Sequence, residues 1–250
     1  MKKFKIGIAL SGGGSRGYAH LGMLRALEEK GIKPDVISGV SAGAMVGAFI
    51  ASGKSPDEIF HLMKDNKFTD FAQVIVPKSG LLSLDKVRKL LKQHLAIDSF
   101  SELKIPLYVA TTNLIDGKIE YFNSGSLLDA VQASMSIPVL FSPVKIGKGL
   151  YADGGIMNNL PVDPLIGKCK RTICISISPV QKAKNIKTLI DAALRTFQLS
   201  VEANTRGIED KCDLFIEPEA LADYDLLNTS HADEMYDIGY EYCKNLKIKL

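Results

Sequence analysis

A serine stands between two glycines in the run Gly39-Val40-Ser41-Ala42-Gly43, which is the spacing of a serine nucleophile on a tight turn. A serine hydroxyl reacts poorly unless a sharp strand-to-helix turn exposes it beside a base and a preorganised oxyanion site. Apolar runs precede and follow this serine, and Gly39 and Gly43 let the flanking backbone pack closely. The pattern predicts that Ser41 is a catalytic nucleophile. The alternative is a glycine-containing turn in which Ser41 only caps the next helix.

A second glycine-rich run, Gly12-Gly13-Gly14-Ser15-Arg16-Gly17, follows the first apolar run of the chain. Backbone N–H groups in such a loop, at the positive end of a helix, point outward and bind anions. We therefore predict an oxyanion hole made by Gly12, Gly13 and Gly14, with the N–H groups of Gly13 and Gly14 as its main donors. One site would then use both glycine motifs.

The same run also fits the G-x-G-x-x-G pattern of dinucleotide-binding proteins through Gly12, Gly14 and Gly17. A dinucleotide site needs an acidic residue at the end of the second strand, where it holds the ribose hydroxyls. Asp35 instead precedes the second predicted strand, which ends at the serine motif. The sequence favours the oxyanion loop, and nucleotide binding remains an alternative that a titration with NAD or ATP would test.

A serine nucleophile needs a base, and none of the four histidines has an evident catalytic context. His20, His61 and His94 fall in predicted helices, and His231 stands at a predicted helix start. Because no orienting partner is apparent for any of them, packing, capping or surface roles are favoured.

The elements that position these motifs alternate between strand and helix at the start of the chain. Residues 4–10 form an apolar run, residues 17–30 carry apolar side chains at helical spacing, residues 36–40 predict a buried strand and residues 42–51 a second helix. Two consecutive strand-to-helix units indicate a parallel sheet with helices on its faces.

Local signals mark the later elements. Ser55 and Pro56 predict a helix start, Ser83 begins an amphipathic helix, and Asp116-Gly117 predicts a tight turn. Further expected elements are strands at 106–112 and 118–122, short strands near Gly147 and Gly149, a strand at 171–178, a helix at 186–206, a strand at 213–216 and a final helix from about residue 232.

Residues 66–82 have no clear hydrophobic period and mix aromatic and aliphatic residues with polar ones. A segment of this kind is either a lid over an apolar pocket or an ordinary loop packed on the core. The sequence leaves these two alternatives open.

Composition limits the class of protein. The chain has 250 residues, of which 46% are hydrophobic, and this suits a single domain over residues 1–250. The formal net charge of +3 gives no strong field for binding nucleic acid. The four cysteines form no C-x-x-C pair and no metal-ligand cluster with histidines, which favours reduced thiols and a cytoplasmic location. The N-terminal apolar run is too short for a signal peptide, and no run reaches the roughly 20 residues that span a bilayer.

Three motifs stand in order along the chain: Gly12–Gly17, Gly39–Gly43 and Asp153-Gly154-Gly155. Between the second and third lies the segment Ala133–Val144, with the sequence ASMSIPVLFSPV. In these features the sequence resembles the bacterial patatin-like phospholipase family, which carries G-G-G-x-R-G, G-x-S-x-G and D-G-G in that order and a similar A-S-x-x-I-P-x-x-F-x-P segment. The resemblance covers residues 6 to about 160, and it implies a three-layer α/β/α fold with a mostly parallel central sheet.

The resemblance also implies a Ser-Asp dyad, which would resolve the absence of a histidine base. Asp153 would accept the proton of Ser41, and Gly154 and Gly155 would let the backbone turn tightly around it. Without the resemblance, these three residues indicate only a turn. An ordinary aspartate has a pKa of about 3.9 and is a weak base, so a dry, preorganised site would be required.

Several other residues receive less specific assignments. Asp129 and Asp163 are weaker candidates for the base, because neither is flanked by glycines beside a strand end. Arg16 suits either an extra contact to an anionic group or a structural contact. The residues expected to line an acyl pocket, with core packing as the alternative, are Ile137, Leu140 and Phe141.

The sequence thus predicts a serine acyl hydrolase that cleaves lipid acyl esters, of phospholipids or lysophospholipids, through an acyl-Ser41 intermediate. No metal or cofactor is implied, and a transient contact with a membrane surface would bring the substrate. Two alternatives remain: an esterase or thioesterase for non-lipid substrates, and a regulatory patatin-like protein with weak hydrolase activity.

Overall fold

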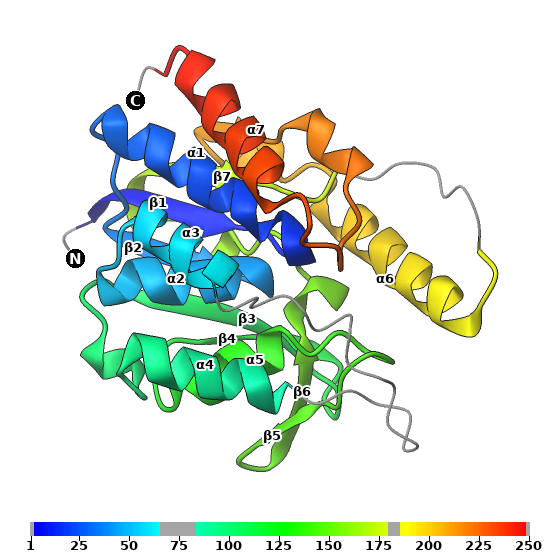
Figure 1. Ribbon diagram of the computed structural model, residues 1–250. Coiled ribbons are helices and arrows are strands. Elements are labelled where there is room, and N and C mark those ends of the chain that lie inside the picture. The colour runs from blue at the N-terminus through cyan, green and yellow to red at the C-terminus, as the bar shows by residue number, and fades with distance from the viewer. Residues whose placement is uncertain (1–2, 66–83, 180–185, 249–250) are drawn as a thin grey trace.

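The computed structural model of the chain describes residues 3–65, 84–179 and 186–248. The segment 66–82, with its two alternatives of lid and packed loop, lies outside the described residues. The described residues form an eight-stranded sheet in the order β5-β6-β3-β2-β1-β7-β8, with β4 paired to β3 (Figure 1). The strands are β1 Phe4–Leu10, β2 Val36–Gly39, β3 Leu107–Asn113, β4 Lys118–Phe122, β5 Val144–Ile146, β6 Gly149–Asp153, β7 Cys169–Ile175 and β8 Leu214–Ile216.

The sheet is mostly parallel. Strands β3, β2, β1, β7 and β8 pair in parallel, while β4, β5 and β6 add antiparallel pairs beside β3. The predicted turn at Asp116-Gly117 joins β3 to β4, and Gly117 has the positive φ of 63° that such a turn favours. The predicted parallel sheet and this hairpin are both confirmed.

Several helices begin where local signals predict them, whereas α5, at Leu127–Ser134, is not among the expected elements. The backbone N–H of Ser55 donates to Glu58 Oε2 at 2.7 Å and that of Glu58 donates to Ser55 Oγ at 3.3 Å, which is a reciprocal cap. The helix expected from Ser83 begins at Asp85. The α-helices are α1 Gly17–Glu29, α2 Ala42–Ser52, α3 Pro56–Asp65, α4 Asp85–Leu95, α5 Leu127–Ser134, α6 Leu189–Thr205 and α7 Ala232–Asn245.

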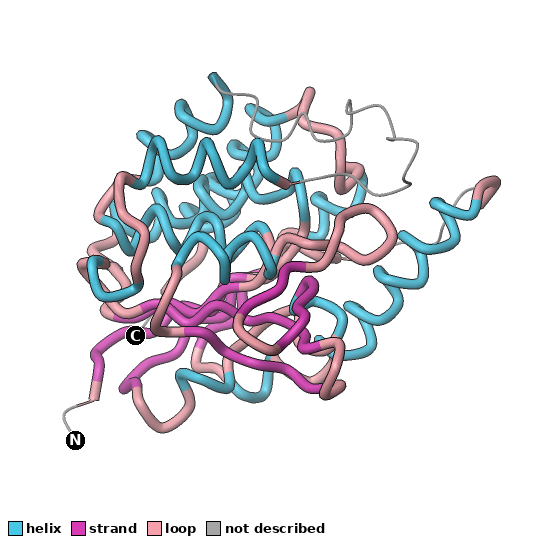
Figure 2. Tube along the Cα trace, turned by 90° about the horizontal axis from the view of Figure 1, so that it is seen from below, coloured by secondary structure: helices cyan, strands magenta, loops and turns pink. Residues whose placement is uncertain are grey.

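Side chains on the two faces of the sheet belong to separate apolar clusters. In β1, Ile8 and Leu10 pack into the large cluster with the helices, whereas Ala9 joins the smaller cluster on the other face. The smaller cluster is covered by the segment 160–165 and by Ile208. Figure 2 shows that most helices gather on one side of the strands. The predicted three-layer α/β/α architecture is confirmed, with a thin second outer layer.

The last helix packs directly on the first. A Cβ on Gly22 of α1 would overlap the backbone of Tyr236, and a Cβ on Gly239 of α7 would overlap the backbone of Ala19. Helices can approach this closely only where side chains are missing from the contact. The C-terminal region is thereby fastened to the helix that follows the glycine loop. Within the described residues, no helix is long and apolar enough to cross a membrane.

Candidate active site

Ser41 occupies a strained turn between β2 and α2. Its φ of 52° and ψ of −121° lie where residues other than glycine are rarely found. The turn is tight because a Cβ on Gly39 would overlap the carbonyl of Gly43, and a Cβ on Gly43 would overlap the carbonyls of Leu10 and Ser11. Both flanking glycines are therefore required by close backbone contact, and the serine is held at the end of the strand.

The hydroxyl of Ser134, at the end of α5, fixes the backbone of this turn. The N–H of Ser41 donates to Ser134 Oγ at 2.8 Å, and the Ser134 hydroxyl donates to the carbonyl of Ala110 at 2.7 Å. All three groups are buried. One side chain thus connects the turn to β3, and it lies within the Ala133–Val144 segment that marked the resemblance.

Strands β2 and β6 run toward each other along β3. The parallel pairing of β2 ends with Gly39 opposite Val109, and the antiparallel pairing of β6 ends with Asp153 opposite Thr111. A Cβ on Gly154 would overlap the carbonyl of Ala110 and approach the Val40 side chain at 2.9 Å, so the two strand ends meet at Ala110. Asp153 is thereby brought beside the serine turn.

The Asp153 carboxyl is fully buried, and burial raises its pKa to about 7. The N–H of Gly155, which donates to Oδ1 at 2.8 Å, and the nearby Ser41 hydroxyl lower this pKa by smaller amounts. No described residue gives Oδ2 a formed hydrogen bond. The second carboxyl oxygen is therefore available to receive a proton, and such contacts often tighten only when substrate is bound.

The glycine loop lies next to the serine, since a Cβ on Gly12 would be 3.2 Å from Cβ of Ser41. The N–H of Gly12 already donates to the carbonyl of Asn159 at 3.2 Å, which removes it from the predicted set of oxyanion donors. Among the described residues, no acceptor is found for the N–H of Gly13 or of Gly14. These two groups remain as candidate donors.

Arg16 is buried and bonded entirely to backbone. Its guanidinium nitrogens donate to the carbonyl of Tyr224 at 2.7 and 2.9 Å and to that of Pro179 at 3.1 Å, with longer contacts to Ala222 and Ile177. Burial lowers the pKa of Arg16 to about 10, while the charges of Asp225 and Glu217 act in the opposite direction. Of the two roles open from the sequence, these contacts correspond to the structural one.

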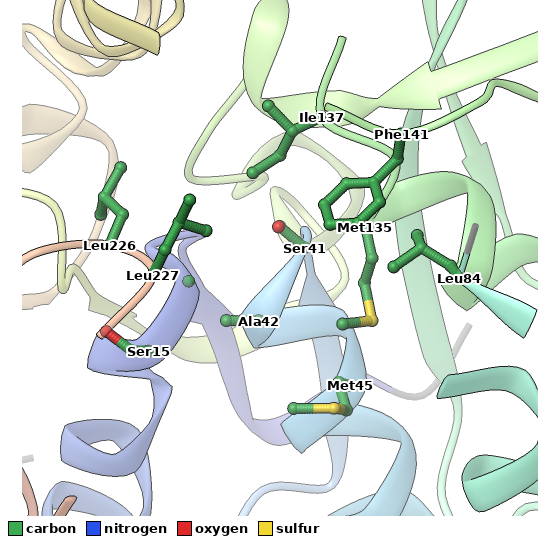
Figure 3. Close-up of a pocket in the computed structure, with 11 residues that line it drawn as sticks. Ser15, Ser41, Ala42, Met45, Leu84, Met135, Ile137, Phe141, Leu226 and Leu227 are labelled. Carbon is green, nitrogen blue, oxygen red and sulfur yellow. The ribbon is translucent and has the colours of Figure 1, made fainter. Parts of the chain in front are cut away.

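An apolar cavity opens beside Ser41, with a volume of about 490 Å³ that includes its mouth (Figure 3). Ile137 and Phe141 line it as predicted, whereas Leu140 is buried in the core and is not among the lining residues. Leu226 and Leu227, far away in the sequence, form the opposite side in Figure 3. The remaining apolar side chains of the lining are Ala42, Met45, Leu84 and Met135.

The four histidines lie in surroundings unlike those of a general base. His20 is buried, its Nε2 is 2.9 Å from the carbonyl of Ser11, and burial lowers its pKa to about 4. His61 is exposed on α3 beside the Phe60 ring, His94 is on α4, and His231 pairs with Glu234 at the start of α7. Their predicted packing and surface roles agree with these positions.

The weaker candidates for the base are engaged elsewhere. Asp129 forms an ion pair with Arg88, and Asp163 accepts hydrogen bonds from Asn158 and Tyr121. Asp35 accepts from the N–H of Ile6 at 2.8 Å, close to the start of β2 and away from the glycine loop. Within the described residues, no group of three or more potential ligands is placed to hold a metal ion.

Other residues at the site were beyond the reach of sequence reasoning. Ser134 and Asn159 lie close to motifs, and that proximity was their only signal. Ser178, Asn204 and the Leu226-Leu227 wall have no sequence signal, because their importance depends on contacts between distant parts of the chain.

Comparisons with known proteins agree on one family. The family model described as patatin-like phospholipase matches residues 8–166. An uncharacterized NTE family protein of Mycobacterium tuberculosis is 34% identical over 178 residues, which cover 70% of this chain and 49% of that protein. A lysophospholipase of Kluyveromyces lactis is 25% identical over 272 residues, covering 95% of this chain and 19% of that protein. The neuropathy target esterase of Drosophila melanogaster is 32% identical over 166 residues, covering 63% of this chain and 12% of that protein.

The chain thus spans half or less of the length of these curated relatives. Among solved structures, VipD from Legionella pneumophila is similar with a TM-score of 0.54 and 18% identity, over 97% of this chain and 66% of that chain. At this identity the similarity concerns the fold.

Proposed function

Because this chain belongs to the patatin-like phospholipase family, we propose that it is a serine hydrolase that cleaves the acyl esters of phospholipids or lysophospholipids with a dyad of Ser41 and Asp153. Two relatives bear names of matching chemistry, a lysophospholipase and an esterase. The observation that carries the proposal is the meeting of a buried carboxyl with a strained serine turn, whose serine lines an apolar cavity.

In the first half of the reaction, Ser41 Oγ attacks the ester carbonyl carbon while its proton moves to Asp153 Oδ2. The raised pKa of about 7 makes Asp153 a far better base than an ordinary aspartate. The negative charge on the carbonyl oxygen is held by the N–H groups of Gly13 and Gly14. Collapse of the tetrahedral intermediate breaks the ester C–O bond, the leaving alcohol takes the proton from Asp153, and an acyl-Ser41 ester remains.

In the second half, water attacks the acyl carbonyl and Asp153 accepts a proton from it. The same N–H groups hold the second oxyanion. When this intermediate collapses, the bond from Ser41 Oγ to the acyl carbon breaks, Oγ recovers the proton from Asp153, and the fatty acid leaves. No net proton is retained by the enzyme, so the dyad returns to its starting state.

The cavity supports a lipid acyl chain as the bound group. Among the described residues, its lining side chains are apolar apart from Ser15 and Ser41, and none of them is charged. Contact with apolar walls contributes roughly 25 cal/mol per Å² of buried apolar area. A charged head group has no partner among the described lining residues, so we expect it to remain at the mouth.

We further propose a single domain, a cytoplasmic location and transient contact with a membrane surface. The described part of residues 1–250 forms one domain, supported by the packing of α7 on α1 and the pairing of β8 with β7. The enzyme acts in the cytoplasm, since its four cysteines are free. Transient contact with a membrane surface brings the substrate to the cavity.

Labelling with a fluorophosphonate, followed by peptide mapping, tests the nucleophile. The expected result is one modified peptide that contains Ser41, with labelling lost in Ser41→Ala and kept in Ser52→Ala, a matched helix-end serine. Asp153→Asn should remain folded and lose at least about a thousandfold in kcat, since it has no base to accept the proton. Labelling at another residue, or full activity in either dyad variant, would exclude this mechanism.

Substrate comparison separates the remaining alternatives. We expect higher kcat/KM for a long-chain lysophospholipid than for a short soluble ester or an acyl thioester. A preference for the short ester or the thioester would favour the non-lipid hydrolase. Stoichiometric labelling with negligible turnover on every substrate would favour the regulatory role.

A further inference from the structure

The side chain of Asn159 lies between the glycine loop and the turn after Asp153. A Cβ on Gly12 would overlap Asn159 Oδ1, and a Cβ on Gly155 would approach the same oxygen at 2.7 Å. Both glycines are therefore required by the same amide. Asn159 is buried, and its own carbonyl accepts the N–H of Gly12 at 3.2 Å. Asn159 thus lies between the glycine loop and the Asp153-Gly154-Gly155 turn and contacts both.

Asn204, near the end of α6, fastens the Asp153 side of this arrangement. Its Oδ1 accepts the N–H of Asn159 at 2.8 Å, and its Nδ2 donates to the carbonyls of Gly155 at 2.9 Å and Ile156 at 3.2 Å. Three backbone groups around the turn are therefore fixed by one amide. Gly155 also donates its N–H to Asp153, so the position of Gly155 affects the pKa of the Asp153 carboxyl.

Ser178, just beyond β7, fastens the glycine-loop side. Asn159 Nδ2 donates to Ser178 Oγ at 3.1 Å, and the Ser178 hydroxyl donates to the carbonyl of Gly12 at 2.5 Å. In a planar trans peptide, the carbonyl and the following N–H point in opposite directions. Holding the Gly12 carbonyl on the Ser178 side therefore turns the N–H of Gly13 to the other side of the loop. A second hydroxyl, that of Ser11, donates to the same carbonyl at 2.9 Å.

We propose that Asn159, Ser178 and Asn204 form a positioning relay that orients the Gly13 N–H for the oxyanion and keeps it in register with the turn that carries Asp153. The relay rests on the proposed hydrolase function and deepens it. None of the three residues touches the reacting atoms. Their effect is exerted through the Gly12–Gly13 peptide on one side and through Gly155 on the other.

Ser178→Ala tests the oxyanion arm. We expect kcat to fall by about 10- to 100-fold, less than the 10²- to 10³-fold typical of losing an oxyanion donor outright, with KM changed by less than about 2-fold. The inhibition constant of an alkyl trifluoromethyl ketone, which adds to the serine and places an oxyanion in the hole, should rise by the same factor as kcat falls. Ser178→Thr keeps the hydroxyl and should restore kcat to within about 3-fold of the wild type.

Asn204→Ala tests the Asp153 arm. Freeing Gly155 weakens its N–H bond to the Asp153 carboxylate, so the pKa of Asp153 should rise and the acid limb of kcat/KM against pH should move to higher pH. Ser178→Ala should leave that limb in place. Thr205→Ala is the matched control, because in the described part of the chain its hydroxyl bonds only within α6, to the carbonyls of Val201 at 2.9 Å and Glu202 at 3.2 Å. If Asn204→Ala does not fold, Asn204→Ser, which also removes the amide and adds no charge, replaces it.

The outcomes distinguish the relay from the function on which it rests. If the wild type is not labelled at Ser41, the proposed function fails and the relay fails with it. If the wild type is labelled and active, but folded Ser178→Ala keeps both kcat and the ketone affinity, the relay alone is wrong. A lower melting temperature without either kinetic change would assign these residues a purely structural role and would likewise overturn the relay.

Discussion

The part of the chain that carries the motifs and the part that lacks them contribute differently to the candidate site. Residues 8–166, which the family model matches, contain Ser41, Asp153 and the glycine loop. Residues 177–227 contain none of these groups, yet they supply Ser178, Asn204, the acceptors of Arg16 and one wall of the cavity. The motifs mark groups proposed to react, whereas many groups that hold them come from a region without a motif.

The reason for this difference is chemical. A nucleophile or a base needs a particular side chain, and an oxyanion loop beside it needs glycine. Support is given largely by backbone carbonyls: Ser15 donates its N–H to that of Leu226 at 2.8 Å and its hydroxyl to that of Asp225 at 2.7 Å. Every residue type carries a backbone carbonyl, and only the conformation of the chain decides where it points. The supporting region can therefore hold the site without a recognisable sequence motif.

The pH dependence of activity should depend on the motif region alone, because Asp153 belongs to that region. Since burial raises the pKa of Asp153 to about 7, the carboxyl is protonated below that pH and cannot accept the serine proton. We expect kcat/KM to fall with decreasing pH through an apparent pKa near 7, by about 100-fold at pH 5. An acid limb near pH 4 would mean that the carboxyl is better solvated or better bonded than its burial indicates.

The stability of Asp153→Asn provides a control, because this variant should lose activity but gain stability. A carboxyl whose folded pKa is raised favours folding fully only below its unfolded pKa, and that contribution is lost as pH rises through about 7. The amide does not ionise, so the variant should gain stability over the wild type between about pH 4 and pH 7. The gain could reach about 4 kcal/mol, because each pKa unit corresponds to about 1.4 kcal/mol. Urea unfolding at pH 5 and pH 8 would measure it.

Local chemistry explains which parts of the site could be predicted from the sequence. The serine turn between β2 and α2 and the hairpin at Gly117 depend on residues adjacent in the chain, and both were predicted in the right places. The meeting of β2 and β6 depends on their shared partner β3, so Asp153 was implied only by the family resemblance.

Two predicted assignments needed long-range contacts to be judged. Gly12 has the right residue type for an oxyanion donor, but its N–H is used by Asn159, more than a hundred residues away. Leu140 has the right hydrophobicity for a pocket, and all three residues belong to the same buried cluster, but only Ile137 and Phe141 line the cavity. Hydrophobicity and residue type restrict the candidates, and the fold selects among them.

Arg16→Lys would break the connection between the two regions. The planar guanidinium of Arg16 donates to the carbonyls of both Tyr224 and Pro179. A lysine ammonium cannot reproduce this set of donors, so at least one of these carbonyls loses its partner. We expect a loss of about 1–3 kcal/mol in unfolding free energy and a fall in kcat of about 10-fold. Arg25→Lys, at a partly exposed position on α1, the helix that follows Arg16, is the matched control. Reduced stability with unchanged kcat would show that the C-terminal region supports the fold but not the reaction.

Leu227→Ala should have the smallest effect, and it tests whether the C-terminal wall contacts the substrate. Leu227 and Ile137 line the same cavity from the two regions, so shortening either should raise KM for a long-chain substrate by about 3- to 5-fold, a loss of roughly 1 kcal/mol of apolar contact. The KM for an acetyl ester should not change, because its acyl group is too short to reach these walls. Leu199→Ala, at an exposed leucine on α6 that does not line the cavity, controls for general loss of apolar surface. If Ile137→Ala raises KM and Leu227→Ala does not, the acyl chain binds against the motif region alone, and the C-terminal region acts on the site only through its backbone contacts.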